Sequence, residues 1–304
     1  MKGRFAPSPT GRMHLGNVFS ALLSWLSARS KGGEWLLRIE DLDPQRSRRE
    51  YADMIMEDLR WLGLEWDEGP GRERVSAAPY WQSERSDIYE EYLRKLCAKG
   101  LVYPCHCTRA DILATQAPHE SDGRVVYKGT CRPKAGYMAD LSEVAALRLM
   151  VPDEEVRFTD GHYGEGMVNL AQQCGDFIVR RKDGAWAYQL AVVVDDALMG
   201  VTEVVRGRDL LLSAPQQMYV ARLLGFDSPA FTHLPLLCNA AGQRLSKRDK
   251  SLDMGALRER FTPEEVIGRL AFLAGLTDRE EPMAAKELVD YFSWERVPCD
   301  DIMV

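Results

Sequence analysis

The first residues with the means to do chemistry lie in the N-terminal run at residues 4–17. A turn at residues 7–11, with two prolines and a glycine, joins an apolar stretch to a stretch of helical periodicity. A strand that enters a helix through such a turn leaves backbone N–H groups free at the helix N-terminus, where they attract phosphate. His14 and Asn17 stand at that point and can donate hydrogen bonds, and Gly16 lets a flat ring or a ribose approach the backbone. The run therefore predicts a nucleotide site.

Charged residues follow two other apolar stretches, at the point where each would end as a strand. Glu40 follows residues 34–39, and Arg206 follows residues 201–205. Ligands of open parallel sheets gather beyond the carboxyl ends of the strands. A carboxylate at Glu40 suits an ammonium group, and a guanidinium at Arg206 suits a carboxylate. Purely local roles stay open, since acidic residues after a strand also cap helices and Arg206 can pair with Asp209.

Three cysteines fall within one segment of the chain. Cys105 and Cys107 point the same way if the chain is extended there, and Cys131 supplies a third sulfur. A structural zinc ion takes four tetrahedral ligands, mostly sulfur and nitrogen. The candidates for the fourth ligand are His106, His119 and Tyr127. The alternative is a set of reduced thiols without metal.

The rest of the pattern predicts the elements that position these residues. Helical stretches alternate with apolar ones, which favours a parallel α/β sheet. Periodicity does not decide between strand and helix at residues 188–194. The expected helices cover residues 15–29, 51–63, 86–99, 213–224, 263–275 and 284–292, with Thr262 as the N-cap of the fifth. The segment at residues 101–184 interrupts the alternation with irregular chain that holds a short strand pair (159–174), a strand (175–181) and a return after Asp183-Gly184.

Composition bounds the class of protein. With 304 residues, 45% hydrophobic and 28% charged, the chain is long enough for more than one globular domain. A net charge of −7 excludes a strongly basic nucleic-acid binder, so any RNA contact has to come from local basic patches. The chain has no run of 18 apolar residues and no secretory signal, so we expect a cytosolic protein without a membrane span. Seven cysteines in such a chain favour metal binding or buried thiols over disulfides.

A second nucleotide signal lies near the other end, where residues 239–248 form a basic turn. Together with residues 4–17, this turn resembles the two nucleotide-binding signatures of the class I aminoacyl-tRNA synthetases, in the form of the glutamyl branch. Arg244 and Arg248 stand where the second signature has its first lysine and its last serine. The resemblance implies an α/β fold: a Rossmann-type parallel-sheet nucleotide-binding catalytic domain, a zinc-containing α+β insert and a C-terminal helical region.

The same resemblance implies the residues that bind ATP and L-glutamate. Lys247 neutralises charge that grows on the pyrophosphate leaving group, and His14 shares the catalytic role. The implied ATP-binding residues are His14, Gly16, Asn17, Arg46 and Lys247. An amino acid with two carboxylates and an amine needs an acid and at least one arginine. The implied glutamate-binding residues are Arg4, Phe5, Ala6, Pro7, Ser8, Glu40, Tyr188 and Arg206.

The pattern Cys-x-Cys followed by Tyr-x-x-x-Cys resembles the zinc site of the glutamyl-queuosine tRNA(Asp) synthetases, a shortened branch of the glutamyl family. That resemblance implies Tyr127 as the fourth ligand, beside Cys105, Cys107 and Cys131, of one structural Zn²⁺. It also implies three parts: a discontinuous catalytic domain at residues 1–100 and 185–240, an inserted acceptor-binding-like module at 101–184, and the basic loop with a helical region at 241–304. Glutamyl-tRNA synthetases continue beyond this region, so we expect no anticodon-binding domain.

The resemblance implies an enzyme that makes glutamyl-adenylate from ATP and glutamate without tRNA, with Mg²⁺ accompanying the ATP. The glutamyl group then passes to queuosine at the wobble position of tRNA(Asp). We expect a cytoplasmic monomer. Two alternatives remain at this point: a glutamyl-tRNA synthetase that lacks its anticodon domain, and a catalytically silent synthetase-like RNA-binding protein.

Overall fold

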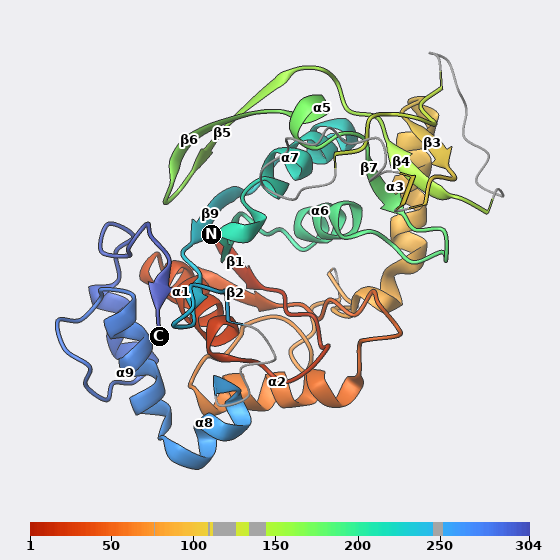
Figure 1. Cartoon of the computed structure of the whole chain (residues 1–304). Coiled ribbons are helices and arrows are strands. Elements are labelled where there is room, and N and C mark those ends of the chain that lie inside the picture. Colours follow the sequence, from red (N-terminus) through yellow and green to blue (C-terminus); the bar gives the residue numbers. More distant parts are fainter. Residues whose placement is uncertain (76, 109, 112–125, 134–143, 246–251) are drawn as a thin grey trace.

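The computed structural model describes residues 1–75, 77–108, 110–111, 126–133, 144–245 and 252–304. Lys247 and His119 lie outside these residues. The strands are β1 Lys2–Phe5, β2 Glu34–Leu37, β3 Val102–Cys105, β4 Ala146–Leu149, β5 Glu155–Asp160, β6 Gly164–Asn169, β7 Phe177–Arg180, β8 Glu203–Gly207, β9 Ala230–Leu234, β10 Leu237–Cys238 and β11 Ile302–Met303. The α-helices are α1 Leu15–Ser30, α2 Arg49–Trp61, α3 Ser86–Ala98, α5 Leu170–Gln173, α6 Tyr188–Leu198, α7 Ser213–Leu224, α8 Met254–Arg260 and α9 Pro263–Leu273 (Figure 1). Single 3₁₀ segments cover Gln82–Arg85, Arg208–Leu210 and Ala285–Tyr291.

Parallel strands form the middle of the molecule. β1 pairs with β2 and β8 pairs with β9, each in parallel. β1 also lies beside the start of β8, because the Thr202 N–H donates to the Lys2 carbonyl at 2.9 Å. The carboxyl ends of β1 and β8 therefore meet at one edge. The predicted α/β fold with a parallel sheet is confirmed.

The hairpin of β5 and β6 was expected only as a short strand pair within irregular chain. It is instead a regular antiparallel hairpin paired from Glu155 to Asp160 on β5. At Asp160, β5 also pairs in parallel with Phe231 of β9. The hairpin thus reaches from the 101–184 segment to the strands beside the predicted site.

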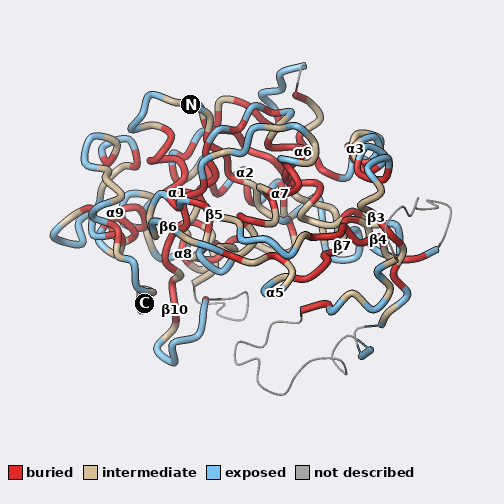
Figure 2. The backbone as a smooth tube through the Cα atoms, turned by 90° about the horizontal axis from the view of Figure 1, so that it is seen from above, coloured by how far each residue is buried: buried red, intermediate tan, exposed pale blue. Residues whose placement is uncertain are grey.

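A separate antiparallel sheet, in the order β3-β4-β7, lies far from α8 and α9 in Figures 1 and 2. β3 ends at Cys105, the first of the three clustered cysteines. A small group of buried side chains surrounds this end: Tyr103, Cys105, Tyr127 and Met150.

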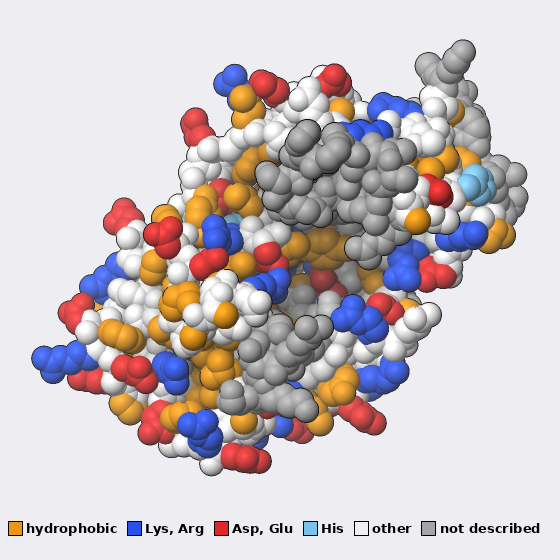
Figure 3. Space-filling view, in the orientation of Figure 1, with side chains coloured by type: hydrophobic (Ala, Val, Ile, Leu, Met, Phe, Trp, Pro, Cys, Tyr) orange, Lys and Arg blue, Asp and Glu red, His pale blue; other side chains and the backbone are white. Residues whose placement is uncertain are grey.

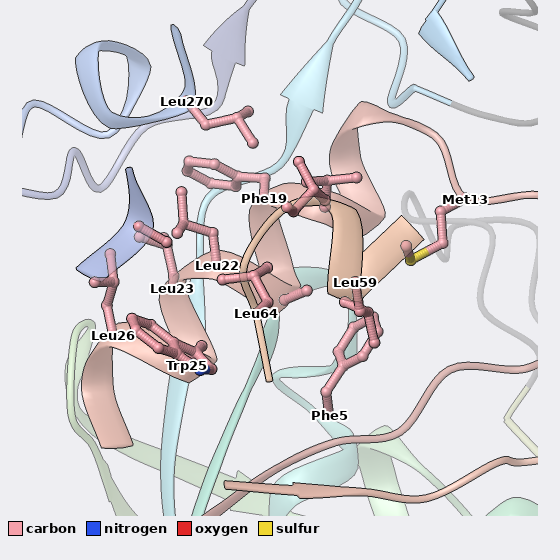
Figure 4. Close-up of a cluster of buried hydrophobic side chains, with 14 of the residues drawn as sticks. Phe5, Met13, Phe19, Leu22, Leu23, Trp25, Leu26, Leu59, Leu64 and Leu270 are labelled. Carbon is pink, nitrogen blue, oxygen red and sulfur yellow. The ribbon is translucent and has the colours of Figure 1, made fainter. Parts of the chain in front are cut away.

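The main hydrophobic core surrounds α1, which is buried on most of its circumference (Figure 2). Its side chains meet residues from β1, α2 and α9 (Figure 4). The labelled members are Phe5, Met13, Phe19, Leu22, Leu23, Trp25, Leu26, Leu59, Leu64 and Leu270. A helix this apolar on all sides is stable only inside a core, so α1 is a rigid support for the turn that precedes it.

Two further elements differ from the sequence-based expectation. The return strand expected after Asp183-Gly184 is only a bridge between Arg180 and Trp186, and α6 begins at Tyr188. The valines at 192–194 are buried in this helix, so tertiary packing outweighs their strand propensity. The last expected helix is a 3₁₀ segment, Ala285–Tyr291. Among the described residues, no helix is long and apolar enough to cross a membrane.

Candidate active site

A cavity of about 430 Å³ opens where the carboxyl ends of β1 and β8 meet. Its wall comes from the turn before α1, the start of α6, β8 and the chain after β9. Figure 3 shows that this face of the molecule is hollowed near its middle, with side chains of both charges at the rim. The residues predicted for glutamate and nucleotide that line the cavity are Arg4, Phe5, Ala6, Pro7, Ser8, His14, Gly16, Asn17, Glu40, Tyr188 and Arg206.

Glu40 brings a carboxylate to this cavity. Its side chain is 9% exposed, and its Oε1 accepts a hydrogen bond of 3.1 Å from Arg38. Burial raises the pKa of Glu40, although Arg38 and Arg4 pull it down. A charge that is costly to bury and only partly compensated favours a cationic ligand.

Arg206 brings a buried guanidinium to the same cavity. Its Nε donates to His233 Nε2 at 3.0 Å, and its two terminal nitrogens donate to Tyr188, Gln217 and the Leu210 carbonyl. Among the described residues no carboxylate forms an ion pair with Arg206, and burial lowers its pKa. The pairing with Asp209 that the sequence left open does not occur, because Asp209 pairs with Arg244. A buried cation without an anionic partner suits an anionic ligand.

The turn before α1 is built differently from our expectation. His14 caps the helix: its Nδ1 accepts from the Gly16 N–H at 3.1 Å, and its carbonyl accepts from the Asn17 N–H at 2.8 Å. The His14 N–H in turn donates to Asn17 Oδ1 at 3.1 Å. The sequence predicted free backbone N–H groups here for phosphate, but those of Gly16 and Asn17 are already hydrogen-bonded. With Nδ1 as acceptor, the neutral ring carries its proton on Nε2.

The His14 cap explains, on steric grounds, why residue 16 is a glycine. A Cβ at this position would stand 3.1 Å from the His14 ring atoms Cε1 and Nδ1, closer than ordinary van der Waals contact. Glycine thus lets the imidazole close over the helix N-terminus.

Arg46 does not line the first cavity. It lines a second cavity of about 480 Å³, which shares Ser8, Thr10, Glu40 and Tyr188 with the first. Lys247 is outside the described residues, whereas Arg244 and Leu245, just before it, line the first cavity.

Sequence reasoning missed the charges beneath the cavity. Arg38 is fully buried and binds Asp196 at 2.7 Å as well as Glu40. Asp195, beside Asp196, accepts from Arg85 Nε at 2.6 Å and from Gln82 and Tyr89. The available signal was Arg38 itself, a charged residue inside the otherwise apolar stretch at residues 35–39.

The cysteine cluster has the geometry of a metal site. The Sγ atoms of Cys105, Cys107 and Cys131 all lie within 4.8 Å of one another. The Tyr127 hydroxyl lies 3.5 Å from Cys105 Sγ, 3.9 Å from Cys107 Sγ, and accepts from the Cys131 N–H at 2.7 Å. Zinc–sulfur bonds of about 2.3 Å in a tetrahedron require sulfur atoms roughly 3.8 Å apart, so the donor set fits such an ion. His106 is exposed and is not a member of the cluster.

The thiols differ in acidity. Burial raises the pKa of Cys107 to about 11. At Cys131 burial acts in the same direction, but hydrogen bonds from the His106 backbone, Tyr127 and the neighbouring thiols lower the pKa to about 7. Cys131 therefore becomes the thiolate that binds metal more readily than Cys107.

Comparison with known proteins gives a consistent result. Residues 1–300 match the family described as tRNA synthetases class I (E and Q), catalytic domain. Among curated proteins, the chain is 48% identical to the glutamyl-Q tRNA(Asp) synthetase of Symbiobacterium thermophilum, over 99% of this chain and 95% of that protein. It is 47% identical to the protein of the same name from Nitratidesulfovibrio vulgaris, over 98% of this chain and 94% of that protein.

Among solved structures, a glutamate tRNA ligase from Elizabethkingia meningosepticum in complex with its amino acid superposes with a TM-score of 0.83 at 30% identity. The match covers all of this chain and 66% of that ligase. A glutamate-tRNA synthetase from Elizabethkingia anophelis gives the same TM-score at 29% identity, with 68% of it covered. The chain thus spans about two thirds of the length of these structural relatives.

Proposed function

The chain belongs to the class I tRNA synthetases of the glutamate and glutamine group, and we propose that it activates L-glutamate with ATP and transfers it to queuosine in tRNA(Asp). The observation that carries the proposal is the pair of opposite charges in one cavity. Arg206 is a buried cation that pairs with no described carboxylate, and Glu40 is a buried anion. Glutamate, with an extra carboxylate and an ammonium group, complements both.

In the proposed activation step, the chain mainly positions and neutralises its substrates. Glu40 binds the substrate ammonium, while Arg206 and Arg4, with Tyr188, bind the side-chain carboxylate. The free α-carboxylate then attacks the α-phosphorus of ATP; a carboxylate O–P bond forms and the P–O bond to pyrophosphate breaks. His14 offers its ring N–H to ATP, and Lys247 neutralises the departing pyrophosphate.

The transfer step uses the mixed anhydride so formed. A hydroxyl of queuosine at the wobble position attacks the glutamyl carbonyl, loses its proton, and AMP leaves with the bonding electrons. Mg²⁺ accompanies ATP and balances its charge. The names of the relatives support queuosine-bearing tRNA(Asp) as acceptor. We expect the enzyme in the cytoplasm, as a monomer.

The cysteine cluster has a structural part in the proposal. Cys105, Cys107, Cys131 and Tyr127 would hold one Zn²⁺, which when bound ties β3 to the residues around 127–131. The group of buried side chains at this place is small. Metal binding in such a module contributes directly to the free energy of folding.

The test is ATP–pyrophosphate exchange with glutamate in the absence of tRNA, followed by transfer of labelled glutamate to tRNA(Asp) with and without queuosine. Exchange without tRNA, and transfer only to the queuosine form, is the expected result. Exchange that requires tRNA(Glu) would indicate a glutamyl-tRNA synthetase instead. No exchange under either condition would indicate a catalytically silent protein.

A further inference from the structure

Two buried side chains behind Arg206 have no part in the proposed chemistry. Asp160, at the end of β5, is 3% exposed, and His233, on β9, is fully buried. His233 stands directly opposite Arg206 in the register of β8 and β9. The two residues therefore lie on the side of Arg206 away from solvent.

The hydrogen bonds to Arg206 determine which nitrogen of His233 carries the proton. Arg206 Nε donates to His233 Nε2 at 3.0 Å. A guanidinium has donors only, so His233 Nε2 must accept. The ring proton is then on Nδ1, which donates to Asp160 Oδ2 at 2.6 Å. One tautomer alone satisfies both contacts.

Asp160 is itself held rigidly. Its Oδ1 accepts from the backbone N–H groups of His162 and Tyr163 at 3.0 Å, and from that of His233 at 3.1 Å. Next to it, Gly161 approaches β9 so closely that a Cβ would stand 2.3 Å from Thr232 Oγ1. The turn of the β5–β6 hairpin thus locks the carboxylate in place.

The contact with Arg206 fits a neutral ring. Burial lowers the pKa of His233, and the charge of Arg206 acts in the same direction, against the opposing effects of Asp160 and of the Leu210 backbone. A second ring proton on Nε2 would also face the N–H of Arg206. The neutral ring is thus the form that can accept from the guanidinium.

We infer that Asp160 and His233 are positioning residues for the amino-acid substrate: Asp160 selects the tautomer of His233, and His233 aims the guanidinium of Arg206 at Tyr188 and the cavity. The inference rests on the proposed function, since it gives Arg206 a substrate carboxylate to meet. An arginine whose Nε loses its acceptor can rotate, and its other donors then miss the carboxylate.

Two substitutions of His233 distinguish a role in orienting the guanidinium of Arg206 from a role in packing alone. In His233→Asn the side-chain amide replaces the Nδ1 end, so Asp160 keeps a donor while Arg206 Nε loses its acceptor. In His233→Gln the amide oxygen reaches the place of Nε2 and accepts from Arg206. We expect His233→Asn to raise the KM for glutamate about 10- to 100-fold, as expected for a lost hydrogen bond to a charged group. His233→Gln should restore most of that loss, and the KM for ATP should stay constant in both.

Asp160→Asn tests the choice of tautomer. The single amide oxygen keeps the three backbone N–H donors, so the NH₂ group faces His233 Nδ1 and forces it to accept. The ring proton moves to Nε2, against the N–H of Arg206, with little change in shape. This variant should raise the KM for glutamate as His233→Asn does, with kcat less affected. Asp53→Asn, the same exchange at an exposed aspartate of α2, is the matched control and should behave as wild type.

¹⁵N NMR of the histidine rings measures the tautomer without substrate, and with five histidines the signals can be assigned by substitution. We expect the Nδ1–H form of His233 in the wild type and the Nε2–H form in Asp160→Asn. Equal KM values for His233→Asn and His233→Gln, or an unchanged tautomer in Asp160→Asn, would overturn the inference. A wild type without glutamate-dependent exchange would instead overturn the proposed function.

Discussion

The cavity and the cysteine cluster are built in contrasting ways. The cavity gathers residues from the N-terminal turn, from Glu40, from Tyr188 and Arg206, and from Arg244, which are distant in sequence. The cluster draws on one short segment, from Cys105 to Cys131. Sheet packing over a large core positions the first, whereas the second has only a small apolar group behind it.

The two regions obtain their rigidity from different sources. Beneath the cavity, Arg38 and Arg85 are paired with Asp195 and Asp196, all four buried, and Arg38 also pairs with Glu40 at the cavity wall. Ion pairs inside a core hold a geometry firmly, because removal of one partner leaves an unpaired charge. Beside the cluster, the buried carboxylate of Asp176 accepts from the Tyr103 hydroxyl and the Val151 N–H, but its ion-pair partner Arg132 is 41% exposed. Among the described residues this frame is smaller and closer to solvent, so we expect a bound metal to add much of the local rigidity. Changes in the cavity should therefore alter catalysis, and changes in the cluster should alter local stability.

The largest effect should come from Lys247→Ala. Its proposed charge acts mainly in the transition state, so kcat for adenylate formation should fall about 100- to 1,000-fold with little change in glutamate affinity. ATP–pyrophosphate exchange and calorimetric glutamate binding measure the two quantities. A similar loss in both would contradict the role given to Lys247.

Arg206→Ala should act on binding instead. Loss of the buried guanidinium removes charge-assisted hydrogen bonds to the substrate carboxylate, and the KM for glutamate should rise about 100-fold. The KM for ATP serves as the internal control and should not change. A variant in which both KM values rise together would mean that Arg206 supports the whole cavity rather than glutamate.

Cys131→Ser should act on the other region. The bound metal should fall from about one ion per chain to none, and the thermal transition of the segment around β3 should move to lower temperature. Elemental analysis and hydrogen exchange measure this, and exchange activity should fall far less than in Arg206→Ala. Cys299→Ser, at an exposed thiol, is the control. Unchanged metal content in Cys131→Ser would refute the ligand set.

The affinity of the cavity for glutamate should also depend on pH, through Glu40 and independently of the cysteine cluster. Burial raises the pKa of Glu40 above its ordinary value of 4.5. The charged form binds the ammonium group, so glutamate affinity should fall as the pH drops through that raised pKa, by about tenfold per unit below it. In Glu40→Gln affinity should be lower and flat over the same range. Equal pH profiles for the two proteins would argue against the contact.

The smallest effect should come from a site outside both regions. Thr262 caps α9, accepting from the Glu265 N–H at 3.2 Å. Thr262→Ala should reduce the free energy of unfolding by about 1 kcal/mol, as measured by urea denaturation. Metal content and exchange activity should match the wild type, which gives the baseline for the other variants.

Local signals were sufficient for much of this protein. α7 begins and ends at the predicted Ser213 and Leu224, and the cap at Thr262 is present. The strand ends predicted to carry Glu40 and Arg206 do line one cavity. Periodicity, caps and turns depend on residues a few positions apart, and that information is written in the order of the chain.

Other features were decided only by the tertiary structure. The helix at Tyr188–Leu198, the burial of Arg38 and the contact of Asp160 with His233 and Arg206 depend on partners far away in sequence. The backbone N–H of Gly16, predicted to be free for phosphate, instead donates to the His14 ring that caps α1. The types and spacing of the residues determined which chemistry is available. Burial and long-range pairing, which no local pattern encodes, decided which of those groups face a ligand and which hold the others in place.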